Sequence, residues 1–78
     1  MQPTSFDETI DLAALPAPMP VLHARRALGK LRSGQVLRVL AQGGEVSRDF
    51  LDFAKLTGCA LKTEPLGDGT VEYFLQKR

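Results

Sequence analysis

Thiols, imidazoles and indoles are scarce in this sequence of 78 residues, which has no tryptophan, one histidine (His23) and one cysteine (Cys59). A single thiol excludes a disulfide framework, and one histidine with one cysteine is too few for a structural metal site. No apolar run approaches the roughly 20 residues that a membrane-spanning helix needs. Asp7 and Glu8 near the N-terminus are unlike a secretory signal. We therefore expect a cytoplasmic protein with no metal, no cofactor and no membrane partner.

A large excess of charge of either sign is also missing, since ten basic and nine acidic residues give a net charge of +1. This balance excludes a strong general attraction to nucleic acid or to a membrane surface. The segment from Arg25 to Arg38 nevertheless holds basic residues and no acid. It is open to three interpretations: a solvated helix face, a docking surface for an acidic protein, or a nucleic-acid site. We do not expect the last, because few aromatic side chains are available to stack on bases.

The chain is long enough for one domain, residues 1–78, and we expect residues 1–5 to be a disordered end. Apolar residues alternate or run together over four short segments, and they recur at helical spacing over two longer ones. The pattern predicts strands at 6–12, 35–41, 59–64 and 71–76, and helices at 18–32 and 46–57. Gly58 follows the second helix, where a left-handed residue commonly ends a helix.

This βαβαββ order predicts an α+β fold. Strand–helix–strand crossovers are almost always right-handed, so both helices should cover the same face of the sheet. The turn at 66–70 joins the last two strands as a hairpin. We expect a two-layer α/β sandwich with a four-stranded mixed sheet and two helices on one face. The buried side of the second helix is predicted to hold Val46, Phe50, Phe53, Ala54 and Leu56.

The connection from the first strand to the first helix is rich in proline and has no nucleophile. Pro18 and Pro20 both fit the first turn of a helix, where the backbone N–H is unpaired in any case. A helix N-terminus carries a partial positive charge, and a cysteine placed there would have a lowered pKa. Such a thiolate could attack a persulfide, hold the sulfur and pass it on.

The stretch from Ile10 to Pro20 resembles the signature of the TusA/SirA family of sulfur-carrier proteins. That signature is an aspartate, two variable residues, glycine, leucine, one variable residue and then Cys-Pro-x-Pro. Asp11, Leu15, Pro18 and Pro20 match it, and the resemblance extends to about Lys77. It implies the same βαβαββ fold and a cytoplasmic protein that receives persulfide sulfur from a cysteine desulfurase or a rhodanese-like protein and hands it on.

The resemblance also suggests which residues meet a partner and which shape the loops. Arg25 matches a basic position that looks like a partner contact in the family, and Arg48-Asp49 matches a pair that commonly opens the second helix. We expect partner contacts at Pro18, Met19, Pro20 and Arg25. Structural roles are expected for Asp11, whose carboxylate could accept hydrogen bonds from the following turn, and for Arg48 and Asp49.

Three residues depart from the family pattern. Ala17 stands where the family has its sulfur-carrying cysteine, Ala14 stands where it has glycine, and Pro16 is unusual before that position. Alanine has no atom that can carry sulfur, so the chain as written cannot perform the family's sulfurtransferase reaction. It is either a natural non-catalytic binding or regulatory protein, or an active carrier whose cysteine was replaced by design. Three departures favour a natural variant, because engineering normally alters one position.

Cys59 and His23 are the remaining candidates for chemistry. We expect Cys59 to be a small buried apolar residue at the start of the third strand. It could act as a displaced sulfur carrier only if it is exposed and close to basic groups. His23, one turn into the first helix, is expected to be partly exposed, with proton relay near the turn as the alternative.

Overall fold

The structure is a computed structural model that describes residues 5–78, so most of the predicted disordered end lies outside the described residues. Six elements follow one another in the predicted order βαβαββ. They are β1 (Glu8–Asp11), α1 (Met19–Gly29), β2 (Val36–Gln42), α2 (Glu45–Thr57), β3 (Ala60–Pro65) and β4 (Thr70–Gln76).

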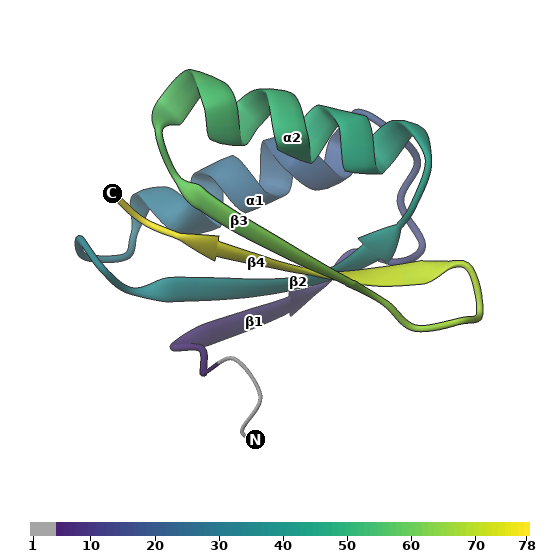
Figure 1. The fold of residues 1–78 in the computed structure, drawn as a ribbon, viewed down its shortest axis with the longest axis horizontal. Coiled ribbons are helices and arrows are strands. Elements are labelled where there is room, and N and C mark those ends of the chain that lie inside the picture. Colours follow the sequence, from purple (N-terminus) through teal and green to yellow (C-terminus); the bar gives the residue numbers. More distant parts are fainter. Residues whose placement is uncertain (1–4) are drawn as a thin grey trace.

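The sheet has the strand order β1-β2-β4-β3. β1 pairs in parallel with β2, and β4 lies between β2 and β3 and runs antiparallel to both. Both helices cover the same face of this sheet, as Figure 1 shows. The predicted two-layer α+β sandwich is therefore confirmed. β1, β2 and β3 all run in one direction, so the segments that follow them lie at the same end of the sheet.

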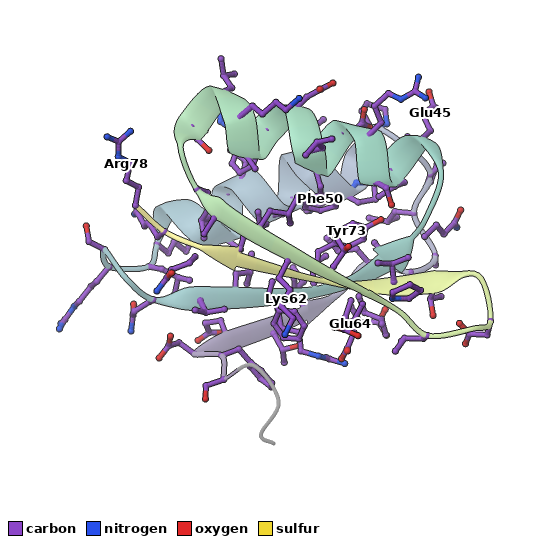
Figure 2. All side chains as sticks on the ribbon, in the orientation of Figure 1. Glu45, Phe50, Lys62, Glu64, Tyr73 and Arg78 are labelled. Carbon is purple, nitrogen blue, oxygen red and sulfur yellow. The ribbon has the colours of Figure 1, made fainter. Side chains whose placement is uncertain are left out.

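The core lies between the sheet and the two helices. Phe50 from α2 stacks on Tyr73 from β4, with ring centroids 4.4 Å apart (Figure 2). Leu37, Val39 and Leu75 complete the centre from the two middle strands, and none of them is exposed by more than 1%. Burial of this apolar surface is the main force that holds the two layers together.

α1 ends earlier than predicted, at Gly29 rather than near residue 32. The next two N–H groups, of Lys30 and Leu31, bond three residues back, which tightens the last turn. Lys77, from the end of the chain, donates its Nζ to the carbonyls of Gly29 and Leu31 at 3.2 and 2.6 Å. A cation from a distant segment therefore satisfies this helix end, and no local pattern could have indicated it.

The second helix is close to its prediction at both ends. It begins at Glu45, one residue early, and ends at Thr57 with Gly58 in the predicted left-handed conformation, φ +78°. Leu56, however, was wrongly assigned to the buried side, because it is 86% exposed. It lies two residues beyond buried Ala54, which is about 200° further around the helix.

The edges of the strands also differ from prediction by one or two residues. β1 covers Glu8–Asp11 rather than 6–12, although single backbone hydrogen bonds from Asp7 N–H to Val36 O and from Leu12 N–H to Leu40 O extend the contact with β2 at both ends. Cys59 was expected to open the third strand, but β3 begins at Ala60. No helix within residues 5–78 is long and apolar enough to cross a membrane.

The basic residues from Arg25 to Arg38 do not form one surface. Arg38 lies on the sheet face opposite the helices, where its guanidinium contacts Glu72 at 2.6 Å and donates to Thr9 at 2.9 Å. The same group sits 5.6 Å from the ring centroid of Phe6. The other basic residues belong to α1 and the turn after it. Arg38 is therefore separated from the basic residues of α1 and its following turn.

Candidate functional site

The turn between β1 and α1 begins with fixed backbone geometry. Leu12 continues the pairing with β2 by donating its N–H to Leu40 O at 2.7 Å, and its side chain is buried. The next residue, Ala13, donates its N–H to the Asp11 carboxylate at 3.0 Å. A bond of this kind closes a tight turn on the aspartate side chain. The Asp11 carboxylate thus helps to hold the turn in its observed conformation.

A hydrogen-bonded path runs from the core to this turn. The Tyr73 hydroxyl donates to Gln42 O at 2.7 Å and lies 2.5 Å from Ser47 Oγ. The Gln42 amide in turn donates to Ala13 O at 2.9 Å. Burial raises the pKa of Tyr73, and its hydrogen bond with Ser47 opposes that rise in part. Tyr73 therefore donates to Gln42 O as a neutral phenol, and Gln42 in turn holds Ala13 in the turn.

The sequence offered little sign of this path. Tyr73 looked like one of several apolar strand residues, and Gln42 looked like the first residue of a loop. Their connection depends on β2 and β4 being neighbours in the sheet, with residue 42 placed opposite residue 70. Only the tertiary structure brings these side chains to the turn.

Ala17 ends the turn as a half-buried methyl group that packs against the core. The Ala17–Pro18 peptide bond is cis, and Pro18 occupies the position before the first helical residue. Met19 N–H donates to Pro16 O at 2.9 Å. Pro18 and Pro20 have no N–H at all, so this helix start has fewer free donors than helix N-termini generally offer.

A hollow on α1 lies beside the turn. It is lined by Met19, Leu22, His23 and Arg26, and we call these four residues the α1 docking surface. Met19 and Leu22 are 39% and 51% exposed, which is high for large apolar side chains. The four positions share one side of the helix, because their spacings of three, four and seven match the helical repeat. That spacing is visible in the sequence, and from it Leu22 and Arg26 could have been predicted as contact residues beside Met19.

The expected contact residues do not all lie on this surface. Pro18 and Met19 are exposed beside the turn, whereas Pro20 is fully buried and forms part of the core. Arg25 is exposed, but it lines a different cavity, with Leu28 and Phe53. Arg26, its neighbour, is the basic residue that the structure brings to Met19.

Cys59 is half-buried and free, and it lines the cavity to which Arg25 contributes, together with Lys77 and Arg78. It is thus partly exposed and close to basic groups. It lies far from the turn, however, because it precedes β3 while Ala17 follows β1, and the two strands run in the same direction. The thiol and the turn therefore stand at opposite ends of the sheet. Residues 5–78 contain no group of side chains that could hold a metal ion.

Arg48 and Asp49 lie in the early turns of α2, which begins three residues before Arg48. Arg48 is exposed, Asp49 is half-buried, and no salt bridge joins the two within the described part of the chain. The helix start is instead defined by Gly44, whose φ of +64° favours glycine, and by Arg48 N–H donating to Gly44 O at 3.2 Å.

Comparison with known proteins decides the family. The family model described as Sulfurtransferase TusA matches residues 8–77. The chain belongs to the TusA family. The sulfur carrier protein TusA of Allochromatium vinosum is 36% identical over 72 residues, which cover 92% of this chain and 95% of the relative. The sulfur carrier protein TusA of Pseudomonas entomophila is 31% identical over 72 residues, or 92% and 90% of the two chains.

A solved structure supports the same conclusion about the fold. The SirA-like protein from Desulfitobacterium hafniense superposes with a TM-score of 0.82 at 25% identity, covering 90% of this chain and 96% of its own. The resemblance to the TusA/SirA family is thus confirmed over nearly the whole chain. Relatives that are sulfur carriers place this TusA-family chain among the proteins of sulfur-transfer pathways.

Proposed function

We propose that this chain is a non-catalytic TusA-family protein that binds proteins of a sulfur relay without carrying sulfur itself. The observation that supports this proposal is the chemistry of the β1–α1 turn. From Leu12 to Pro18 every side chain is aliphatic, so the turn holds no group that can be a nucleophile. The one thiol, Cys59, lies at the other end of the sheet.

The α1 docking surface provides the means of binding. Met19 and Leu22 offer apolar area at the centre, and Arg26 offers a cation beside it. Exposed apolar side chains next to a positive charge suit a partner with an apolar patch and a nearby carboxylate. The partner we propose is a sulfur donor or acceptor such as a cysteine desulfurase or a rhodanese-like protein.

Binding is tested with a pair of matched variants. Leu22→Asp places a carboxylate in the docking surface, whereas Leu56→Asp makes the same change at the 86% exposed position on α2. We expect Leu22→Asp to weaken binding to the desulfurase at least about tenfold in calorimetry, because a charge would be buried in the interface. Leu56→Asp should bind like the unchanged chain. Equal binding by both variants would exclude this surface, and no binding by the unchanged chain to any sulfur-relay protein would refute the proposal.

The absence of sulfur chemistry is tested separately. The unchanged chain, incubated with a cysteine desulfurase and cysteine, should gain no sulfur atom by mass spectrometry. Ala17→Cys in a Cys59→Ser background puts the sole thiol at the turn, and we expect that variant to gain one sulfur atom per chain. A persulfide on Cys59 of the unchanged chain would contradict the non-catalytic assignment.

The alternative function is an active persulfide carrier whose cysteine at position 17 was replaced by alanine. It is favoured by the prolines around Ala17, which retain the form of the family motif. The codon for residue 17 in the natural gene separates the two proposals. A cysteine codon would establish the replacement, and an alanine codon would exclude it.

A further inference from the structure

β3 is an open edge of the sheet. It has β4 on one side and, among residues 5–78, no strand on the other. The side chains from Lys62 to Pro65 are exposed. Because an edge strand presents backbone N–H and C=O groups that can pair with a further strand, proteins commonly protect such edges or use them.

The ladder between β3 and β4 determines which groups face outward. Leu66 N–H donates to Thr70 O at 3.0 Å at the hairpin end, which identifies that pair as hydrogen-bonded. Hydrogen-bonded pairs alternate with non-bonded pairs along an antiparallel ladder, so every second residue back from Leu66 bonds to β4 in the same way. The backbone groups of Leu61 and Thr63, which lie between those residues, therefore point away from the sheet.

Pro65 is the third outward position on β3. A proline has no N–H, so at this position it leaves no donor unpaired, and its carbonyl remains available as an acceptor. The outward edge thus offers N–H groups at Leu61 and Thr63 and carbonyl groups at Leu61, Thr63 and Pro65.

Two opposite charges flank the middle of this edge. Lys62 and Glu64 lie on either side of Thr63 in sequence and share one face of β3 (Figure 2). About half of each side chain is exposed. Within one chain the Lys62 ammonium lies 4.0 Å from the Glu64 carboxylate. If a second β3 ran antiparallel to the first, centred on Thr63, each Lys62 would stand directly opposite the partner's Glu64.

The opposite edge of the sheet lacks this complementarity. β1 and the residue before it carry the carboxylates of Asp7, Glu8 and Asp11, with no basic residue among them. Pairing of two β1 edges would bring like charges together, which disfavours the pairing. Of the two edges that the structure describes, β3 is therefore the one suited to a second copy.

We propose that two copies of this chain associate through β3, antiparallel about a two-fold axis at Thr63, to form one continuous sheet. Thr63 N–H donates to the carbonyl of the partner's Thr63, and Leu61 N–H donates to the carbonyl of the partner's Pro65. The two-fold axis repeats both bonds and pairs Lys62 with the partner's Glu64 twice. The interface is short, so the dimer is weak and depends on protein concentration.

This association leaves the proposed docking site open. The two β3 strands run in opposite directions, so the two Ala17 turns lie at opposite ends of the combined sheet. The α1 docking surface takes no part in the contact. Leu22→Asp should therefore dimerise like the unchanged chain, which separates a failure of this proposal from a failure of the proposed function.

The test is sedimentation equilibrium from about 10 µM to about 1 mM chain, the range in which a weak dimer dissociates. We expect the apparent mass to rise from 8.5 kDa toward twice that value. Lys62→Glu gives an edge with two acids and Glu64→Lys gives an edge with two bases. Each change should raise the dissociation constant of the dimer about tenfold or more, because like charges then face one another twice.

Mixing the two variants is the decisive control. Each repels itself, but the acidic edge of one complements the basic edge of the other, so an equimolar mixture should dimerise at least as well as the unchanged chain. Thr63→Pro, which removes an outward N–H and no bond to β4, should abolish the dimer while the circular dichroism spectrum is retained. An unchanged chain that stays at 8.5 kDa up to about 1 mM would overturn the proposal. The proposal would also be overturned if Lys62→Glu or Glu64→Lys dimerised normally alone, or if their mixture did not associate.

Discussion

Replacement of Tyr73 by phenylalanine tests the hydrogen-bonded path that supports the turn. The hydroxyl is completely buried and donates to Gln42 O at 2.7 Å while contacting Ser47 Oγ at 2.5 Å. Tyr73→Phe keeps the ring that stacks on Phe50 and removes only the oxygen. The effect on stability therefore reports the hydrogen bonds and not the packing.

The expected cost follows from the two lost bonds. A typical buried hydrogen bond contributes about 1 kcal/mol net, and a partner left unpaired adds to the loss, so we expect Tyr73→Phe to lower the free energy of unfolding by about 1–3 kcal/mol. For a domain of this size that corresponds to a fall in Tm of roughly 4–24 °C. Ser47→Ala removes one partner but leaves the bond from Tyr73 to Gln42 O, so it should cost about 0.5–1.5 kcal/mol.

The pH dependence gives a second, independent readout. Burial raises the pKa of Tyr73 in the folded chain above its ordinary value of 10.0. The stabilisation from the neutral hydroxyl is complete below pH about 10 and is lost as the pH rises through the folded pKa, by about 1.4 kcal/mol per pH unit. The stability difference between the unchanged chain and Tyr73→Phe should therefore shrink above pH 10.

The assay is direct because Tyr73 is the only tyrosine and the chain has no tryptophan. Titration of the tyrosinate absorbance in the folded protein gives the pKa of this one hydroxyl, and urea unfolding at several pH values gives the free energies. A folded-state pKa at or below 10, or a Tyr73→Phe chain as stable as the unchanged one, would refute the assignment of a buried, hydrogen-bonded hydroxyl.

Two further predictions concern backbone conformation and the open sheet face. Gly58→Ala should lower the free energy of unfolding by about 1–2 kcal/mol in urea unfolding, because φ is +78°, a backbone conformation that alanine rarely adopts. The Arg78 guanidinium, 2.7 Å from the new Cβ, ends a flexible exposed side chain that can move away. Gly29→Ala, in the last turn of α1 with no atom within 4 Å of its Cβ, should be neutral or stabilising by up to about 1 kcal/mol, and a loss equal to that of Gly58→Ala would contradict the conformational argument. Arg38→Met should lower the free energy of unfolding by about 1–2 kcal/mol, because it removes the cation that pairs with the partly buried Glu72 carboxylate. Thermal unfolding measures this loss. The double variant Arg38→Met, Glu72→Gln should recover part of it, because the buried charge is then also removed.

The sequence by itself determined the order of the elements and the family. Apolar residues at periods of two and 3.6 reflect local geometry, so they located four strands and two helices to within a few residues. Gly58 ended the second helix as predicted, because the left-handed conformation is a property of that residue and its immediate neighbours. The proline-rich turn indicated the TusA family for the same reason: its evidence lies in consecutive residues.

Only the tertiary structure decided which side chains meet. Pro20 proved to be core, and Arg26 rather than Arg25 proved to lie beside Met19, because the orientation of α1 on the sheet determines which side of the helix is covered. The path from Tyr73 to the turn and the cap that Lys77 places on α1 join residues far apart in the chain. Such contacts depend on strand order and helix placement, which arise from the packing of the whole domain and leave no periodic signal in the sequence.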